Sequence, residues 1–375
     1  MRILCVGGAR PNFMKLAPLL EALRADSRFH PLLVHTGQHY DHQMSGAFFR
    51  DLGLPDPDFY LGVGSGSHAR QTAEILRSFE PVALDTHPDA VLVVGDVNST
   101  LGCALVAAKL GIAVIHVEAG LRSFDRSMPE EINRVLTDAI SDLLLVSEPS
   151  GVANLRREGA DPQRIHLVGN LMIDSLRRHL VQARAMGMPA RLGLAARSYG
   201  VVTLHRPANV DDPAALESIL EALAEISRDL PLVFPVHPRT RAKLHACEAR
   251  KQAGIRLLDP LSYIEFLSLM ADAAAVFTDS GGIQEETTVL GIPCYTLREN
   301  TERPITLDQG TNVLAGTRKE SILASWRQHG LSRPGARTPD LWDGQAASRC
   351  LKAIETRFGL EPREAPAQAS PGPAE

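Results

Sequence analysis

The segment 275–304, AVFTDSGGIQEETTVLGIPCYTLRENTERP, contains the pattern from which the fold prediction starts. Its first three residues are apolar and predict a buried strand, and the Asp-Ser-Gly-Gly turn at 279–282 predicts the start of a helix. Glycines let a ligand approach the backbone, and the first turn of a helix presents unpaired N–H groups and the positive end of a dipole. We therefore expect an anion, most simply a phosphate, at this turn.

Two carboxylates follow one helical turn later, at Glu285 and Glu286. Either could accept hydrogen bonds from the hydroxyls of a sugar. The alternative interpretation is structural: a serine caps the helix, and acids near its start are favoured by the helix dipole. The turn alone does not decide between the two, because short motifs often match by chance.

The first half of the chain repeats the order of elements in this segment. VLVVGDVNST at 91–100 and KLGIAVIHVEAG at 109–120 correspond to AVFTDSGG and VLGIPCYTLREN. Each half also opens with a strand that leads into Arg-Pro and then Asn, at 10–12 and 206–209. Alternating strands and helices predict parallel sheets. We predict an α/β fold of two Rossmann-like, doubly wound domains that face each other across a central cleft.

Acidic residues follow two of the predicted buried strands. Asp96 comes after the apolar run 90–94, and Glu118 directly follows 113–117. Ligands bind at the carboxyl ends of parallel strands, so both acids are predicted to be functional. Near the N-terminus, Arg10 and Lys15 sit where cations could face a phosphate, although Lys15 could equally be a solvated helix residue. The full G-x-G-x-x-G spacing is missing there, which does not support NAD binding.

A helix is predicted to begin at Pro129, with acids in its first turn. Ile132 and Leu136 belong to its apolar stripe, whereas Glu131 and Arg134 fall on the other face. Helical spacing alone favours a surface ladder of salt bridges for that polar face.

Composition narrows the class of protein. The chain has 375 residues, a net charge of −5 and no long basic run, so neither nucleic acid nor a membrane surface is indicated as a partner. Its five cysteines are scattered without metal-ligand spacing, which predicts a reduced, cytoplasmic protein without structural metal. We expect an N-terminal domain over 1–170, a second over 171–344, a C-terminal helix over 345–360 that packs back on the first domain, and a disordered tail over 361–375.

Seven segments, spread in one order over nearly the whole chain, resemble the non-hydrolysing UDP-N-acetylglucosamine 2-epimerases. They are GARP at 8–11, TGQH at 36–39, GD at 95–96, HVEAGLR at 116–122, PEEINR at 129–134, HR at 205–206 and DSGGIQEE at 279–286. The resemblance implies the two-domain architecture of GT-B glycosyltransferases and phosphorylases. It also implies a cytoplasmic homodimer that needs no cofactor and makes precursors of cell-surface polysaccharide.

The resemblance assigns roles to individual residues. It places the sugar against Asp96, Glu118 and Glu131 and makes Glu118 and Glu131 the candidate base and acid. The catalytic set it implies is Asp96, Glu118, Glu131 and His205. The set it implies for binding the UDP-sugar is Arg10, Lys15, Arg134, Ser280, Gly281, Gly282 and Glu286, with Glu286 on the ribose hydroxyls.

The implied reaction inverts C2 of UDP-N-acetylglucosamine and gives UDP-N-acetylmannosamine. No carbonyl adjoins C2, so the family eliminates UDP across C1–C2 and adds it back to an enzyme-bound glycal. A carboxylate must take the proton, and cations and helix-end N–H groups must stabilise the leaving diphosphate.

Two loops depart from better-known members of that family. Pro207-Ala208 stands where they carry Arg-Glu, and Tyr40-Asp41 stands where they carry Arg after Gln-His. Both loops are linked in the family to activation by a second substrate molecule, which leaves this activation and the identity of the sugar open. The alternatives are a 2-epimerase of a UDP-2,3-diacetamido uronic acid sugar, a hydrolysing epimerase and a glycosyltransferase of the same fold.

Overall fold

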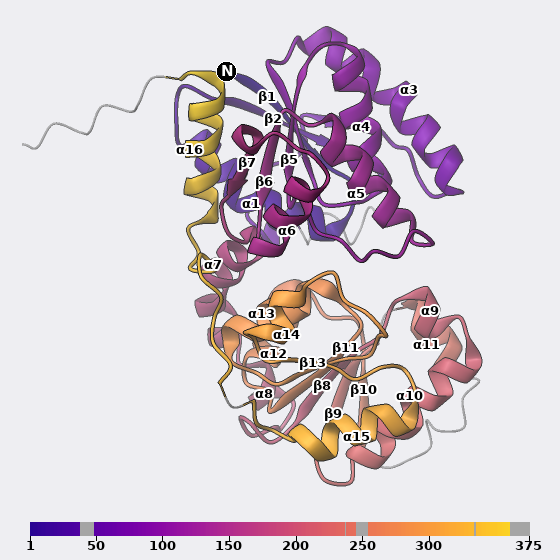
Figure 1. Ribbon diagram of the computed structural model, residues 1–375. Helices are drawn as coiled ribbons and strands as arrows, with labels where there is room; N and C mark the ends of the chain where they lie inside the picture. Colours follow the sequence, from indigo (N-terminus) through magenta and orange to yellow (C-terminus); the bar gives the residue numbers. More distant parts are fainter. Residues whose placement is uncertain (38–48, 237, 245–253, 334, 361–375) are drawn as a thin grey trace, which may run out of the picture.

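A computed structural model gives the fold of the chain and describes residues 1–37, 49–236, 238–244, 254–333 and 335–360 (Figure 1). Two parallel sheets, each with helices packed on its faces, form an upper and a lower unit in the view of Figure 1. This arrangement confirms the predicted α/β class with two doubly wound units. The TGQH motif extends beyond the described residues at 38–39, and Tyr40-Asp41 and the tail 361–375 also lie outside them.

The first unit contains a seven-stranded sheet in the order β3-β2-β1-β4-β5-β6-β7. Its strands are β1 (Arg2–Gly7), β2 (His30–His35), β3 (Phe59–Tyr60), β4 (Ala90–Val94), β5 (Ala113–Val117), β6 (Leu143–Val146) and β7 (Ile165–Leu167). Its helices are α1 (Arg10–Arg24), α3 (His68–Thr86), α4 (Asn98–Lys109), α5 (Pro129–Ile140), α6 (Pro149–Arg157) and the short 3₁₀ turn η1 (Pro162–Arg164).

The second unit contains a six-stranded sheet in the order β10-β9-β8-β11-β12-β13. Its strands are β8 (Gly200–Thr203), β9 (Leu232–Pro235), β10 (Ile255–Leu258), β11 (Ala275–Thr278), β12 (Cys294–Thr296) and β13 (Asn312–Leu314). Its helices are α8 (Met188–Arg191), α9 (Pro207–Val210), α10 (Pro213–Ile226), α11 (Pro238–Leu244), α12 (Tyr263–Ala271), α13 (Gly281–Leu290), α14 (Pro304–Asp308) and α15 (Lys319–His329).

Alternate residues of each central strand enter two different cores, which explains the continuous apolar runs in the sequence. In β1, Ile3 and Cys5 pack in one core with α1, and Leu4 and Val6 pack in another with α3 and α4. Strand β4 is buried along its whole length. Parallel strands covered on both faces need such side chains at every position.

Both sheets reverse their strand order at one point. The chain builds outward from β1 to β3 and then returns to place β4 on the other side of β1, and β8 and β11 repeat this move. Ligands bind in the crevice at the carboxyl ends of strands that flank such a point. The segments that directly follow β1, β4, β8 and β11 carry, in this order, Arg10, Asp96, His205 and Ser280.

Helix α7 (Leu171–Met186) connects the two units, and helix α16 (Ala346–Phe358) returns to the first unit. Helix α7 packs against α1 of the first unit and α12 of the second, and the boundary predicted at residue 170 falls at its start and stays a prediction. Helix α16 lies against α1 in Figure 1, and its first N–H groups, from Ala346 and Ala347, donate to the Asp174 carboxylate. Among the described residues, no helix has both the length and the apolar character needed to cross a membrane.

Candidate active site

Glu118 stands at the end of β5 in a backbone conformation that few non-glycine residues adopt, with φ at +71°. Its backbone N–H donates to the Leu145 carbonyl at 2.9 Å, which ties it to β6. One carboxylate oxygen is paired with Lys15 of α1, and the other accepts from Arg303 Nη2 at 2.8 Å. The side chain is 7% exposed. A buried carboxylate is thus held between two cations, one from each unit.

Arg134 joins the other two predicted acids of the first unit. The guanidinium is buried and contacts the Asp96 carboxylate with one nitrogen and the Glu131 carboxylate, at 2.5 Å, with the other. Burial raises the pKa of Asp96, but the charge of Arg134, with help from Lys15, outweighs it, so the pKa lies below its ordinary value. Asp96 is therefore a carboxylate at neutral pH, and its side chain is 30% exposed, more than the side chain of Glu118 or Glu131.

The Glu131 carboxylate also holds the loop after β5. It accepts hydrogen bonds from the Ser123 N–H at 2.9 Å, the Ser123 hydroxyl at 3.0 Å and the Phe124 N–H at 3.0 Å. Burial raises the pKa of Glu131, but these donors and Arg134 bring it below the ordinary value. Loss of this carboxylate would therefore disturb a loop as well as any proton transfer.

Helix α5 buries its polar face and exposes part of its apolar stripe, which is the reverse of what helical spacing favours. Its polar residues Glu131 and Arg134 are buried in the site, whereas Ile132 and Leu136 of the apolar stripe are 44% and 47% exposed. The surface-ladder interpretation of the polar face is wrong, because this face meets the acids and loops at the edge of the sheet.

In the second unit, Asp279 organises the loop after β8. The fully buried carboxylate accepts from the backbone N–H of His205 and of Arg206, and it pairs with His205 Nδ1 at 2.8 Å. Burial raises the pKa of Asp279, but these partners lower it below the ordinary value. The His205 side chain remains 49% exposed. The carboxylate thus fixes the imidazole while leaving part of its surface accessible.

The N-terminus of α13 is not capped by the side chain of its own serine. Ser280 occupies the cap position, but its side chain makes no capping hydrogen bond, which contradicts the alternative of a serine-capped helix. A side chain at Gly281 would come within 3.2 Å of the Arg303 guanidinium carbon, and one at Gly282 within 3.3 Å of the Met172 methyl group. Glycine therefore keeps the backbone of this helix start close to a buried cation.

Arg303 is the residue that sequence reasoning missed. It contacts Glu118 of the first unit, and its Nε donates to Glu285 at 2.8 Å. Nη1 is buried and makes no hydrogen bond to the described residues, but it lies 3.3 Å from the Glu302 carboxylate as an ion pair. A signal was present: Arg303-Pro304 is a third Arg-Pro pair at a helix start, like 10–11 at α1 and 206–207 at α9.

Three arginines converge on a single buried carboxylate beside this site. Glu302 pairs with Arg298 at 2.8 Å, Arg206 at 3.2 Å and Arg303 at 3.3 Å. Burial raises the pKa of Glu302, but the three cations hold it far below its ordinary value. Arginine guanidinium groups are the side chains that bind phosphate oxygens with two parallel hydrogen bonds, so these three arginines are candidates to contact a diphosphate.

Glu286 and Glu285 have different partners: Glu285 is paired with Arg303, whereas Glu286 contacts Tyr263. Glu286 is buried and accepts from the Tyr263 hydroxyl at 2.8 Å, and burial raises its pKa to about 7. Glu148, just after β6, also has a pKa raised by burial to about 7.

The predicted site residues fall into three groups. Five residues of the first unit lie together: Lys15, Asp96, Glu118, Glu131 and Arg134. The second unit carries His205, Ser280, Gly281 and Gly282, and Glu286 is paired with Tyr263. Arg10 is exposed at the start of α1. Among the described residues, no group of three or more potential ligands could hold a metal ion.

Comparisons with known proteins agree with this geometry. The family model described as UDP-N-acetylglucosamine 2-epimerase matches residues 21–355. A UDP-N-acetylglucosamine 2-epimerase of Methanocaldococcus jannaschii is 42% identical over 86% of this chain and 90% of its own length. A UDP-2,3-diacetamido-2,3-dideoxy-D-glucuronate 2-epimerase of Pseudomonas aeruginosa is also 42% identical, over 87% of this chain and 92% of its own.

Solved structures extend the comparison to three dimensions. The crystal structure of the M. jannaschii enzyme in complex with UDP-GlcNAc and UDP superposes with a TM-score of 0.88 at 39% identity, covering 95% of this chain and 100% of that one. A sucrose-phosphate synthase from Thermosynechococcus elongatus, at 14% identity and a TM-score of 0.59, shares the GT-B-like fold alone. The family match and these relatives show that the chain belongs to the UDP-N-acetylglucosamine 2-epimerase family.

Proposed function

We propose that this enzyme interconverts UDP-N-acetylglucosamine and UDP-N-acetylmannosamine by elimination and re-addition of UDP. The observation that carries the proposal is the arrangement of ion pairs. Asp96 and Glu118 follow strands at one sheet edge, Glu131 of α5 shares Arg134 with Asp96, and Arg303 of the other unit reaches Glu118. A carboxylate base close to a cation that can accompany a leaving diphosphate is what elimination across C1–C2 requires.

The UDP moiety is proposed to bind the second unit. The start of α13, at Ser280 to Gly282, would hold the diphosphate together with Arg303, whose buried guanidinium lies beside Gly281. His205 and Arg10 would approach the diphosphate from the two sides of the cleft. Glu286 would accept a ribose hydroxyl in the ionised form, which its pKa of about 7 leaves partly populated at neutral pH.

Glu118 is proposed as one of the two groups that exchange a proton with C2. The second group is Glu131 or Asp96, and both of these carboxylates are paired with Arg134. Epimerisation needs one group that removes the proton from one face of C2 and another that returns a proton to the opposite face. Both steps balance without an external oxidant or reductant, since UDP leaves and returns with its electron pair.

The first prediction tests this function directly. Incubation with UDP-N-acetylglucosamine alone, in heavy water, should give UDP-N-acetylmannosamine that carries deuterium at C2, seen by proton NMR. A boiled-enzyme sample is the control. Release of free sugar and UDP would instead identify a hydrolysing epimerase. No turnover of UDP-N-acetylglucosamine alone would contradict the proposal and would favour either another UDP-sugar substrate or a glycosyltransferase that needs an acceptor.

A second candidate substrate is a UDP-2,3-diacetamido uronic acid sugar. Two observations favour it: the P. aeruginosa relative named for that sugar is 42% identical, and Arg298 Nη1 is a buried guanidinium nitrogen without a hydrogen-bond partner among the described residues. A uronate would add one carboxylate to the diphosphate, and an arginine could receive it. Comparison of kcat/KM for the two sugar nucleotides, measured in parallel, decides between them.

We also propose that the protein is a homodimer through the outer face of α5. Ile132 and Leu136 are about half exposed there, and Phe124, in the loop that Glu131 holds, is 67% exposed. The inner face of the same helix contributes Glu131 and Arg134 to the site. A partner on the outer face would therefore stabilise the position of the helix and, with it, the site. A two-fold contact lets the same apolar pair pack against its own copy.

The second prediction follows from this interface. The double variant Ile132→Glu/Leu136→Glu should sediment as a monomer, because it places charges on the proposed contact, while the parent protein sediments as a dimer. Val181→Glu, at an apolar residue that is 79% exposed on α7, is the matched control and should remain dimeric. A monomeric parent protein at micromolar concentration would contradict the proposal.

A further inference from the structure

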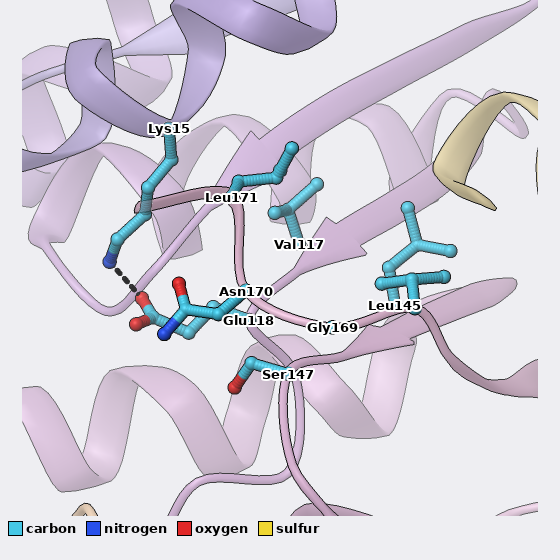
Figure 2. A pocket seen from close by; sticks show the side chains of 9 residues that line it. Lys15, Val117, Glu118, Leu145, Ser147, Gly169, Asn170 and Leu171 are labelled. Carbon is cyan, nitrogen blue, oxygen red and sulfur yellow. Dashed lines mark hydrogen bonds and ion pairs between the residues drawn. The ribbon is translucent and has the colours of Figure 1, made fainter. Parts of the chain in front are cut away.

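A small pocket lies beside the Glu118 carboxylate, between the ends of β5 and β6 and the start of α7 (Figure 2). One part of its wall is apolar, and the other part is formed by polar side chains. The apolar residues are Val117, Leu145, Val168 and Leu171, and the polar ones are Lys15, Glu118, Ser147 and Asn170. The pocket leaves about 10 Å³ for the centre of a water molecule, which is about the space that a single buried water needs.

Two polar atoms of this pocket, Ser147 Oγ and Asn170 Nδ2, have no hydrogen-bond partner among the described residues. Ser147 is 5% exposed and Asn170 3% exposed, so bulk solvent does not reach them. Asn170 Oδ1 is already occupied, because it accepts from the Met172 N–H at 2.9 Å as the cap of α7. In Figure 2 the Asn170 amide lies beside the Glu118 carboxylate, with the Ser147 hydroxyl on the same side of the pocket.

Buried polar groups in proteins are almost always paired, either with protein atoms or with ordered water. Both orphan groups here can donate a hydrogen bond, and Glu118 can accept one. A water molecule between them would accept from Asn170, share a bond with the Ser147 hydroxyl and donate to Glu118, which makes the three bonds typical of a buried water.

We propose that one water molecule is bound in this pocket, and that Ser147 and Asn170 act through it as positioning residues for the Glu118 carboxylate. The three groups belong to the first unit and to the start of α7, whereas Arg303 comes from the second unit. The Arg303 contact depends on how the two units meet, whereas the proposed water contacts involve only the first unit and the start of α7. The water keeps the carboxylate oriented at the moment when a substrate enters.

The positioning role rests on the proposed function of Glu118, but the water site itself does not, and crystallography tests it separately. A ligand-free crystal structure at a resolution that shows ordered solvent should place a water within hydrogen-bond distance, about 2.7–3.2 Å, of Ser147 Oγ, Asn170 Nδ2 and a Glu118 oxygen. A dry pocket, or a Ser147 hydroxyl turned to a protein acceptor, would overturn the proposal.

Kinetics tests the positioning role. Ser147→Ala removes one partner of the water, and Asn170→Ser keeps a capping oxygen for α7 but loses the amide donor. Each is expected to lower kcat by about ten- to hundredfold, as misplacement of a reacting group does, with the KM for the UDP-sugar and the affinity for UDP unchanged. Because both act through one water, the double variant should lose about as much as either single variant rather than the product of the two losses.

Ser141→Ala is the matched control, since Ser141 is also buried but its hydroxyl donates to the Thr137 carbonyl at 2.7 Å, away from the pocket. It should retain the parental kcat. Parental kcat in both pocket variants, or losses that multiply in the double variant, would refute the positioning role. An inactive parent enzyme would refute the proposed function instead, and the crystal structure would still decide whether the water is bound.

Discussion

The variant Glu118→Gln is expected to lose activity by about 10²–10⁴-fold in kcat, the usual contribution of a general acid or base. Glutamine keeps the size of the side chain, but its amide cannot take a proton from C2. The loss should appear equally in the rate at which deuterium enters C2 from heavy water. Initial rates and proton NMR in both reaction directions measure it.

UDP binding separates this loss from a structural defect. UDP is proposed to bind the second unit, and removal of the Glu118 charge frees Arg303 from one of its partners. The affinity for UDP, measured by calorimetry, should therefore be equal to that of the parent or higher. Glu217→Gln, at an exposed position on α10, is the control and should leave both quantities unchanged. Activity within tenfold of the parent would rule out Glu118 as a proton-transferring group.

The acids at strand ends are the part of the site that the sequence predicts best. Asp96 follows the continuous apolar run 90–94, and Glu118 follows 113–117, which is apolar except for His116. Runs of this kind predict parallel strands covered on both faces. The carboxyl ends of parallel strands share one edge of the sheet, so the two acids meet there. The order of the chain is enough for this inference, and the two sheets confirm the fold class that the repeated pattern predicts.

Helix α5 shows where periodicity fails. A stripe of apolar residues predicts which face is buried only if the neighbour on that side is apolar. Here the inner neighbour is a polar site, and Glu131 and Arg134 are satisfied by Asp96 and by the backbone of the loop after β5. Buried ion pairs of this kind depend on residues far away in the chain, which a helical spacing does not record.

Arg303 illustrates the same limit more strongly. Its partner Glu118 is 185 positions earlier in the chain, and nothing in the local sequence records that the two units bring them to 2.8 Å. The Arg-Pro pair marks only the start of a helix. The cation across the cleft is therefore a property of how the units meet, and it needed the structure.

The second large effect is expected at this arginine. Arg303→Met removes a buried guanidinium that contacts Glu118 and Glu285 and that lies against the start of α13. Loss of a preorganised charge that stabilises a developing anion costs about 10²–10³-fold in kcat. The affinity for UDP should fall as well. Arg303→Lys should recover only part of either loss, because an ammonium cannot reach both carboxylates in the geometry of a planar guanidinium.

The free energy of unfolding and kcat should respond differently when Glu285→Met is added to Arg303→Met. Removing one member of a buried ion pair leaves the other uncompensated, at a cost of about 3–5 kcal/mol, whereas replacing both by apolar groups is often nearly neutral. Glu285 is fully buried beside Arg303, and its second carboxylate oxygen has no partner among the described residues. The double variant Arg303→Met/Glu285→Met should therefore regain much of the free energy of unfolding lost in Arg303→Met, as measured by denaturant titration.

Its activity and UDP affinity should stay as low as those of the single variant, because the cation that faces the diphosphate is still missing. This divergence is the decisive measurement for Arg303. If kcat recovers together with the free energy of unfolding, the Arg303 charge serves to balance the buried Glu285 and not to stabilise the leaving diphosphate, and the charge that does so must come from Arg298, Arg206 or the start of α13. If kcat stays low in a refolded, stable protein, the guanidinium acts on the substrate itself.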